Sequence, residues 1–153
     1  MAIKPENRFI NSVNDRMPIK KRSGSTKARN SVPESEWIHY EKMNNPYNSG
    51  TADSWYSGHN DIWVEWKYLP KLPVRDSTLI NPCKMLTALQ QEWLRERYLE
   101  GRNVFVIVGC PDGGVLFRDL SWEKEMSTRT FRDLLQSKNS LAETLRELIS
   151  TRK

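Results

Sequence analysis

Two acidic residues and a lysine of this 153-residue chain are spaced in a way that could support phosphate chemistry. Asp53 follows shortly after a glycine, and Glu65-Trp-Lys67 lies a short distance further along. Mg²⁺ is usually held by one or two carboxylates together with waters and phosphate oxygens. An ammonium group beside such an ion can orient a water or offset negative charge on a phosphate. Asp53, Glu65 and Lys67 are therefore candidate catalytic residues, with Mg²⁺ or Mn²⁺ as the expected cofactor.

A strand is needed to position the Glu-x-Lys pair. Residues 61–68 are rich in β-branched and aromatic side chains and lack glycine and proline, which predicts a strand. Because side chains alternate between the two faces of a strand, Glu65 and Lys67 share one face. The other face carries an apolar set that predicts a core: Ile62, Val64, Trp66 and Tyr68.

A hairpin is needed to bring Asp53 to that strand. Residues 53–56 can form a short strand, and Ser57–Asn60 has the composition of a turn. The hairpin would return Asp53 to the side of Glu65. Asp53 and Glu65 then become the expected metal ligands, with the backbone carbonyl oxygen of Trp66 as a third.

Taken alone, these residues leave two interpretations open. Glu-x-Lys is common in strands, and a cross-strand group of Asp, Glu and Lys is often only a solvated face. The aromatic residues near the hairpin are likewise open to two interpretations, packing within the protein or stacking on nucleobases. They are Trp55, Tyr56 and Trp63.

Further motifs stand in an order that is typical of one nuclease superfamily. They are a glutamate in the N-terminal helix (Glu6), the segment Glu41–Asp53, the Glu65-x-Lys67 strand, and a later helix with Gln90, Trp93-Leu94 and Gly101. Over residues 1–118 the chain resembles the PD-(D/E)xK nucleases. Within them it is similar to phage-encoded endonucleases related to virus-type replication-repair nuclease (VRR-NUC) domains and to Holliday junction resolvases. Ala52 stands where the superfamily has its proline, a position that shapes the approach to Asp53 but supplies no chemistry.

The resemblance implies a fold, an activity and additional site residues. The fold is a restriction-endonuclease-like α/β core, a central mixed sheet flanked by helices. The activity is Mg²⁺-dependent hydrolysis of DNA phosphodiester bonds by an endonuclease, on branched or duplex DNA. Glu6 and Gln90 join the catalytic group, although Gln90 is equally open to interpretation as an ordinary helix-surface residue. The resemblance also implies a possible homodimer and a location in the cytoplasm of a phage's bacterial host.

The charge of the chain suits a polyanionic partner. Its net charge is +5 and its pI is near 9.3. Residues 16–35 hold many basic side chains among Ser, Gly and Thr, which predicts a flexible loop that either lies along DNA phosphates or only aids solubility. The candidate DNA contacts are Lys20, Lys21, Arg22, Lys27, Arg29, Lys42 and Lys71.

The remaining patterns predict a compact α/β domain. Helices are expected over residues 5–13 and from Pro82, capped by Asn81, to just before Gly101. Strands are expected over residues 36–40, 104–108 and 115–117, and the first of these at an edge. The strand at 104–108 is continuously apolar, which predicts burial on both faces and a parallel crossover from the Glu-x-Lys strand. The segment 69–82 is expected to be a loop.

The C-terminal part is predicted to be helical. The expected division is a nuclease core over residues 1–120 and a helical extension over 121–153. Ser127 is expected to cap one helix, and Ser140-x-x-Glu143 is a capping-box pattern at the start of another. The second helix, with Leu141 and Leu145 on one side, would cover the domain or a dimer partner.

Other classes of protein find little support in the sequence. No apolar run approaches the ~20 residues needed to cross a bilayer, and the start lacks the apolar core of a signal peptide. Two cysteines (Cys83, Cys110) and two histidines (His39, His59) lack zinc-ligand spacing, and reduced thiols suit the cytoplasm. His59 is either a turn residue or a phosphate contact. Alternatives to an enzyme are a catalytically silent DNA-binding module and a protein-interaction factor.

Overall fold

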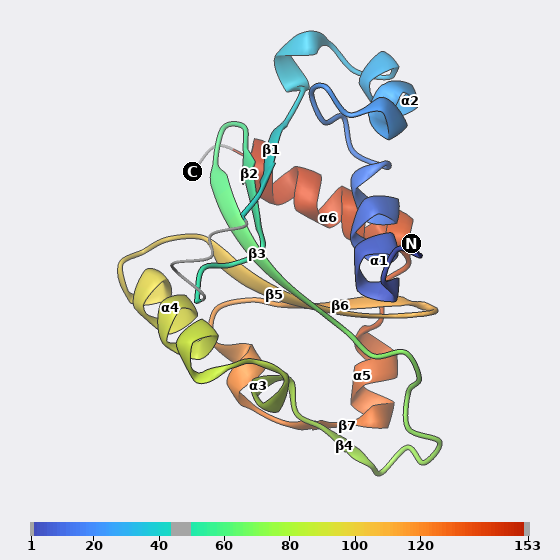
Figure 1. Cartoon of the computed structure of the whole chain (residues 1–153), viewed down its shortest axis with the longest axis vertical. Helices are drawn as coiled ribbons and strands as arrows, with labels where there is room; N and C mark the ends of the chain where they lie inside the picture. Colours follow the sequence, from blue (N-terminus) through green and yellow to red (C-terminus); the bar gives the residue numbers. More distant parts are fainter. Residues whose placement is uncertain (1, 44–49, 152–153) are drawn as a thin grey trace.

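A five-stranded mixed sheet forms the centre of the protein in the computed structural model, which describes residues 2–43 and 50–151 (Figure 1). The strand order is β1-β2-β3-β5-β6, in which β3 and β5 are parallel and all other neighbours are antiparallel. The strands are β1 His39–Lys42, β2 Ser54–Ser57, β3 Asp61–Tyr68, β5 Val104–Cys110 and β6 Gly113–Phe117. The segment Asn44–Ser49, with Pro46 and Tyr47 of the Glu41–Asp53 motif, lies outside the described residues.

Helices cover both faces of the sheet (Figure 1). Helices α1 (Pro5–Asn14) and α6 (Lys138–Ser150) pack side by side on one face. On the other face lie α3 (Pro82–Met85), α4 (Ala88–Leu99) and α5 (Thr128–Leu134). The predicted α/β class, a central mixed sheet flanked by helices with helices at the C-terminal end, is confirmed. No described helix is long and apolar enough to cross a membrane.

The hydrophobic core consists of two clusters, one on each face of the sheet. Under α1 and α6, alternate residues of β3 are buried as predicted: Ile62, Val64 and Trp66. Strand β5 is buried along its whole length, so its prediction as a strand covered on both faces is also confirmed. Residues of α6 and α5 belong to the same clusters as the sheet, because Leu141, Leu145 and Phe131 are fully buried there.

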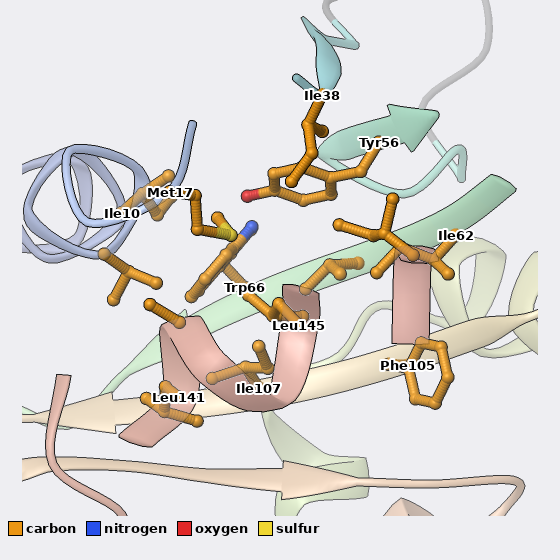
Figure 2. Packing of buried hydrophobic residues seen from close by; sticks show 14 of the residues in the cluster. Ile10, Met17, Ile38, Tyr56, Ile62, Trp66, Phe105, Ile107, Leu141 and Leu145 are labelled. Carbon is orange, nitrogen blue, oxygen red and sulfur yellow. The ribbon is translucent and has the colours of Figure 1, made fainter. Parts of the chain in front are cut away.

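Two polar side chains enter the α1–α6 cluster with their hydrogen bonds satisfied (Figure 2). The Tyr56 hydroxyl donates to Oδ1 of Asn14 at 2.6 Å. The indole Nε1 of Trp66 donates to the Ser54 hydroxyl at 3.0 Å. Because an unpaired polar group costs free energy in an apolar interior, these bonds let the two large rings fill the core and also fix their orientation.

The segment predicted as a loop over residues 69–82 contains a short strand. Strand β4 (Leu79–Ile80) pairs with β7 (Met126–Ser127) in a small antiparallel sheet at the edge of the molecule (Figure 1). Thr128 adds its backbone N–H and its hydroxyl to the carbonyl oxygen of Thr78. The loop therefore ends in a strand that the C-terminal part of the chain supplies with hydrogen-bond partners.

The single helix predicted from Pro82 to Gly101 is divided in two. Asn81 and Pro82 begin α3 as predicted, but the chain becomes extended at Leu86 and a new helix starts after Thr87. Leu89 then lies in the first turn of α4 and is 55% exposed, so it does not contribute to the core. Burial of Leu86 in the core outweighs continuation of the helix at this point.

The prediction of a flexible loop over residues 16–35 was wrong. This segment holds α2 (Thr26–Asn30) between two 3₁₀ turns, Ser23–Ser25 and Glu34–Glu36. Arg22 pairs with Asp15 at 2.8 Å, and Arg29 donates to backbone carbonyls of the same segment and lies over the Trp37 ring. Basic side chains thus fold the segment locally, which composition alone does not reveal.

Two element boundaries also differ from the prediction. The expected strand over residues 36–40 begins at His39, because Glu36 ends a 3₁₀ turn; its place at the sheet edge is confirmed. Helix α6 begins at Lys138 rather than at Ser140, because Ser137 caps it by accepting from the backbone N–H of Ser140 at 3.1 Å. Ser127 caps α5 as predicted.

We expect Leu145→Ala to lower the free energy of unfolding by about 2–5 kcal/mol, because it empties a fully buried site between α6 and the sheet. The matched exchange Leu134→Ala, at a residue that is 50% exposed, should change it by about 0.5 kcal/mol or less. Urea unfolding of both variants measures the difference. Equal losses would contradict the placement of α6 in the core.

Candidate active site

Asp53 and Glu65 face each other at the point where β2 begins. Ser54 pairs with Val64 across the hairpin, so the residue before Ser54 comes opposite the residue after Val64. The backbone N–H of Trp66 donates to Oδ2 of Asp53 at 3.1 Å, which holds the carboxylate against β3. The predicted meeting of these two acids is therefore present in the structure, as is the hairpin that produces it.

The Glu65 carboxyl group is buried, with the residue only 1% exposed. Its Oε2 receives a long contact from Nε2 of Gln90 at 3.5 Å and lies 3.9 Å from Nζ of Lys67. Its Oε1 is buried without a hydrogen-bond partner among the described residues. One oxygen of this carboxyl group thus faces polar side chains, while the other makes no hydrogen bond within the described residues.

The electrostatics of the pair follow from this burial. Burial raises the pKa of the Glu65 carboxyl from its ordinary value of 4.5 to about 10, and the neighbouring Asp53 carboxyl adds to the rise. The Lys67 ammonium opposes it. Two charged carboxylates this close together repel each other. Either a proton on Glu65 or a cation bound between Asp53 and Glu65 would remove this repulsion.

Gln90 reaches Glu65 because a capping box fixes the start of α4. The Thr87 hydroxyl accepts from the backbone N–H of Gln90 at 3.1 Å, and Oε1 of Gln90 accepts from the backbone N–H of Thr87 at 2.9 Å. With its oxygen engaged in this way, the side-chain amide directs its NH₂ group to Glu65. Thr87 was missed in the sequence, although Thr87-Ala-Leu-Gln90 is a capping-box pattern.

Glu6 reaches the same region from the first turn of α1. Burial raises the pKa of its carboxyl, and the Asp53 carboxyl raises it further, whereas the ammonium groups of Lys67, Lys4 and Lys42 lower it. Glu6 lies near Asp53, because the two residues line the same cavity. All five predicted catalytic residues are thus brought together at one end of the β2–β3 hairpin: Asp53, Glu65, Lys67, Glu6 and Gln90.

Ser54 is a second residue that the sequence did not reveal. Its hydroxyl accepts from Nε1 of Trp66 at 3.0 Å and lies 3.3 Å from the Tyr40 hydroxyl. It therefore ties β2 to β3 and β1 directly beside Asp53. The hydrogen bond from the Trp66 indole to Ser54 fixes this residue in the core. The Trp66 backbone, whose N–H donates to Asp53, is held in place with it.

The predicted DNA contacts fall into two groups. Arg22 donates to the Asp15 carboxylate and Arg29 to the backbone carbonyl oxygen of Ile19, so their guanidinium groups support the fold. The lysines are exposed, and Lys42 is close enough to the site to influence Glu6. No contact within the described residues joins the others to the site. The exposed lysines are Lys20, Lys21, Lys27, Lys42 and Lys71.

The aromatic residues of the hairpin pack within the protein. Tyr56 is fully buried, which excludes it from stacking on a nucleobase. Trp55 and Trp63 stack with ring centroids 5.8 Å apart, and the edge of Trp93 from α4 meets Trp63 at 5.7 Å. His59 lies in the turn at the opposite end of β2 from Asp53, which agrees with its interpretation as a turn residue and keeps it away from the site.

Over residues 2–43 and 50–151, no group of three or more His, Cys, Asp or Glu side chains is arranged to hold a metal ion. Among the described side chains, the carboxylates of Asp53 and Glu65 are the pair that an ion at this site would meet. That number is ordinary for Mg²⁺, which keeps several waters and substrate oxygens in its shell.

Comparison with known proteins gives a distant structural likeness. Neither a protein-family model nor a curated protein sequence matches the chain. Among solved structures, it is similar to Hjc, a Holliday junction resolvase from the archaeal hyperthermophile Archaeoglobus fulgidus. The sequences are 15% identical, the TM-score is 0.44, and the match covers 69% of this chain and 88% of the other. A likeness this distant does not bear on activity.

We expect Glu65→Gln to stabilise the metal-free protein at pH 8 but not at pH 5. The folded protein keeps a proton on Glu65 that the unfolded chain loses above about pH 4.5, so folding becomes less favourable as the pH rises toward 10. The free energy of unfolding falls by at most about 1.4 kcal/mol per pH unit. Glutamine does not ionise, so the Glu65→Gln variant avoids this loss.

Thermal unfolding in EDTA at the two pH values measures this effect. Glu92→Gln, at an exposed position of α4, is the matched control and should follow the wild type. Parallel stability curves for wild type and Glu65→Gln would show that the Glu65 carboxyl titrates normally.

Proposed function

We propose that this protein is a metal-dependent endonuclease that hydrolyses DNA phosphodiester bonds, on branched or duplex DNA. The observation that supports it best is the Glu65 carboxyl group, which is buried beside Asp53, Lys67 and Gln90 and has one oxygen without a hydrogen-bond partner in the described part of the chain. A buried carboxyl group without a hydrogen-bond partner destabilises the fold. Such groups are typical of functional sites, where a ligand binds the free oxygen.

The donor atoms at this position fit Mg²⁺ or Mn²⁺. The carboxylates of Asp53 and Glu65 are hard oxygen ligands, which both ions accept. The backbone N–H and C=O of one strand residue point to the same edge, so the Trp66 carbonyl is directed toward the side on which its N–H meets Asp53. When bound, the ion would activate a water and offset charge on the phosphate.

The other side chains supply charge and orientation. Lys67 is placed to hold the attacking water or to offset transition-state charge with its ammonium group. In the reaction the water gives up one proton as its oxygen bonds to phosphorus, the bond from phosphorus to the leaving oxygen breaks, and that oxygen takes up a proton. Gln90 holds Glu65, and Glu6 faces Asp53 from α1. The homodimer implied by the resemblance stays a prediction.

A silent DNA-binding module is the second candidate, because the residues that the structure describes include no group of three or more His, Cys, Asp or Glu side chains arranged to hold a metal ion. Such a module would have the same fold and the same exposed lysines as the proposed endonuclease but would not cleave DNA. Nicking of supercoiled plasmid in the presence of Mg²⁺, with EDTA as the control, separates the two candidates. Absence of metal-dependent nicking at any enzyme concentration would favour the silent module.

We expect Glu65→Gln and Asp53→Asn to lower the cleavage rate at least about 100-fold while DNA binding is largely retained, because each removes charge needed only for the reaction. Lys67→Ala should lower the rate about 10- to 1,000-fold. Rates come from single-turnover cleavage, and binding from fluorescence anisotropy in EDTA. Glu92→Gln is again the control, and a Glu65→Gln variant that cuts as fast as the control would refute the site.

We expect the exposed lysines of the 16–35 segment to contribute salt-dependent DNA affinity. Lys20→Ala with Lys21→Ala should flatten the plot of log affinity against log salt by up to about one unit for each lysine that contacts a phosphate. Lys84→Ala with Lys124→Ala removes two exposed lysines elsewhere and should leave the slope unchanged. Identical slopes for the two double variants would mean that the segment does not touch DNA.

A further inference from the structure

A cavity of about 400 Å³ lies between α1 and the β1–β2 edge of the sheet, directly beside Asp53. Its walls come from Asn7 and Asn11 of α1 and from Tyr40 and Lys42 of β1. Its volume falls within the range of about 300–1,000 Å³ that is usual for small-ligand sites. Asp53 belongs to the proposed phosphodiesterase site, but that proposal does not explain the space beside it.

The polar groups of the cavity are available to a ligand. Asn7 and Asn11 are one helical turn apart, so their side chains lie on the same face of α1. Within the described part of the chain, neither side-chain amide makes a hydrogen bond. Each amide presents both a donor pair and an acceptor, which is the combination that the edge of a nucleobase requires.

The remaining walls combine apolar surface with charges of both signs, because the carboxyl groups of Glu6 and Asp53 line the cavity together with two lysines. Ile10 is 7% exposed and contributes apolar surface, while the Tyr40 ring is supported by Tyr56 at a centroid distance of 5.0 Å. The exposed side chains of Lys4 and Lys42 also line the cavity, where ammonium groups can hold phosphates. A planar, polar-edged group on a charged backbone matches these walls better than an apolar ligand would.

We propose that this cavity receives an unpaired nucleobase of the DNA strand that is cut, next to the scissile phosphate. The inference rests on the proposed function, because Asp53 both lines the cavity and belongs to the proposed metal site. A base inside a duplex must first be unstacked to enter a pocket, and the cost is least where it is already unpaired. The substrate class is thus DNA with an unpaired nucleotide at the cleaved position, in preference to continuous duplex.

Cleavage of three matched duplexes tests this substrate class. One is continuous, one has a single unpaired nucleotide in one strand, and one has an abasic sugar at that unpaired position. Wild type with Mg²⁺ should cut beside the unpaired nucleotide at least about tenfold faster than it cuts the continuous duplex. The abasic substrate, equally flexible but without a base, should lose most of this preference. Equal rates on the unpaired and abasic substrates would overturn the proposal.

Variants of the cavity give the second arm. Asn7→Leu and Asn11→Leu keep side-chain size, remove the amides and favour the helix, so α1 should persist. Each should reduce the preference for the unpaired nucleotide several-fold. Asn30→Leu makes the same exchange at an exposed position of α2 and should retain it. A preference unchanged in both cavity variants would contradict a role for these amides.

A binding measurement separates this inference from the proposed enzyme activity. The unpaired nucleotide is replaced by 2-aminopurine, whose fluorescence reports removal from the base stack, and binding is followed in EDTA. Wild type and Asn30→Leu should change its fluorescence, and the two cavity variants should not. Failure of all cleavage with this fluorescence change intact would refute only the enzyme. Metal-dependent cleavage without the fluorescence change would refute only the cavity.

Discussion

The strand β3 has both faces covered, and most of the site follows from that constraint. Trp66 fills the α1–α6 side of the core, where its indole is bound by Ser54. Because alternate side chains point to opposite faces, Glu65 and Lys67 must then point to the α4 side. The Trp66 backbone, held by this burial, offers its N–H to Asp53. A slip of one residue in the hairpin would exchange the two faces and place a carboxylate in the apolar core.

Burial of Glu65 is a cost to the fold that its neighbours only partly offset. The contacts from Gln90 and Lys67 are long, and one oxygen is unpaired among the described residues. Pairing a buried carboxyl with a second carboxyl makes the charged state still less favourable. In the proposed function, a cation bound by the two carboxylates would offset this cost. The same end of the hairpin opens onto the cavity beside α1, so the proposed chemistry and the proposed base recognition share Asp53.

The sequence predicted the structure correctly where a short local pattern of residues is compatible with one kind of secondary structure. The alternation from Ile62 to Tyr68, the turn at Ser57–Asn60 and the apolar run at Val104–Val108 are strong short-range signals, and each strand forms. It failed where distant contacts decide. The helix expected from Pro82 divides because Leu86 is needed in the core, and the basic 16–35 segment folds because its arginines find acceptors at Asp15 and along the backbone.

The sequence by itself determined the hairpin that brings Asp53 to Glu65 and the face on which Lys67 lies, because strand periodicity and turn composition are local properties. Only the tertiary structure decided that Glu65 is buried, that Gln90 directs its amide to it, and that Glu6 approaches from the opposite layer. Those facts depend on how α1 and α4 dock on the sheet. Docking is set by packing between segments far apart in the chain, which no short stretch of residues encodes.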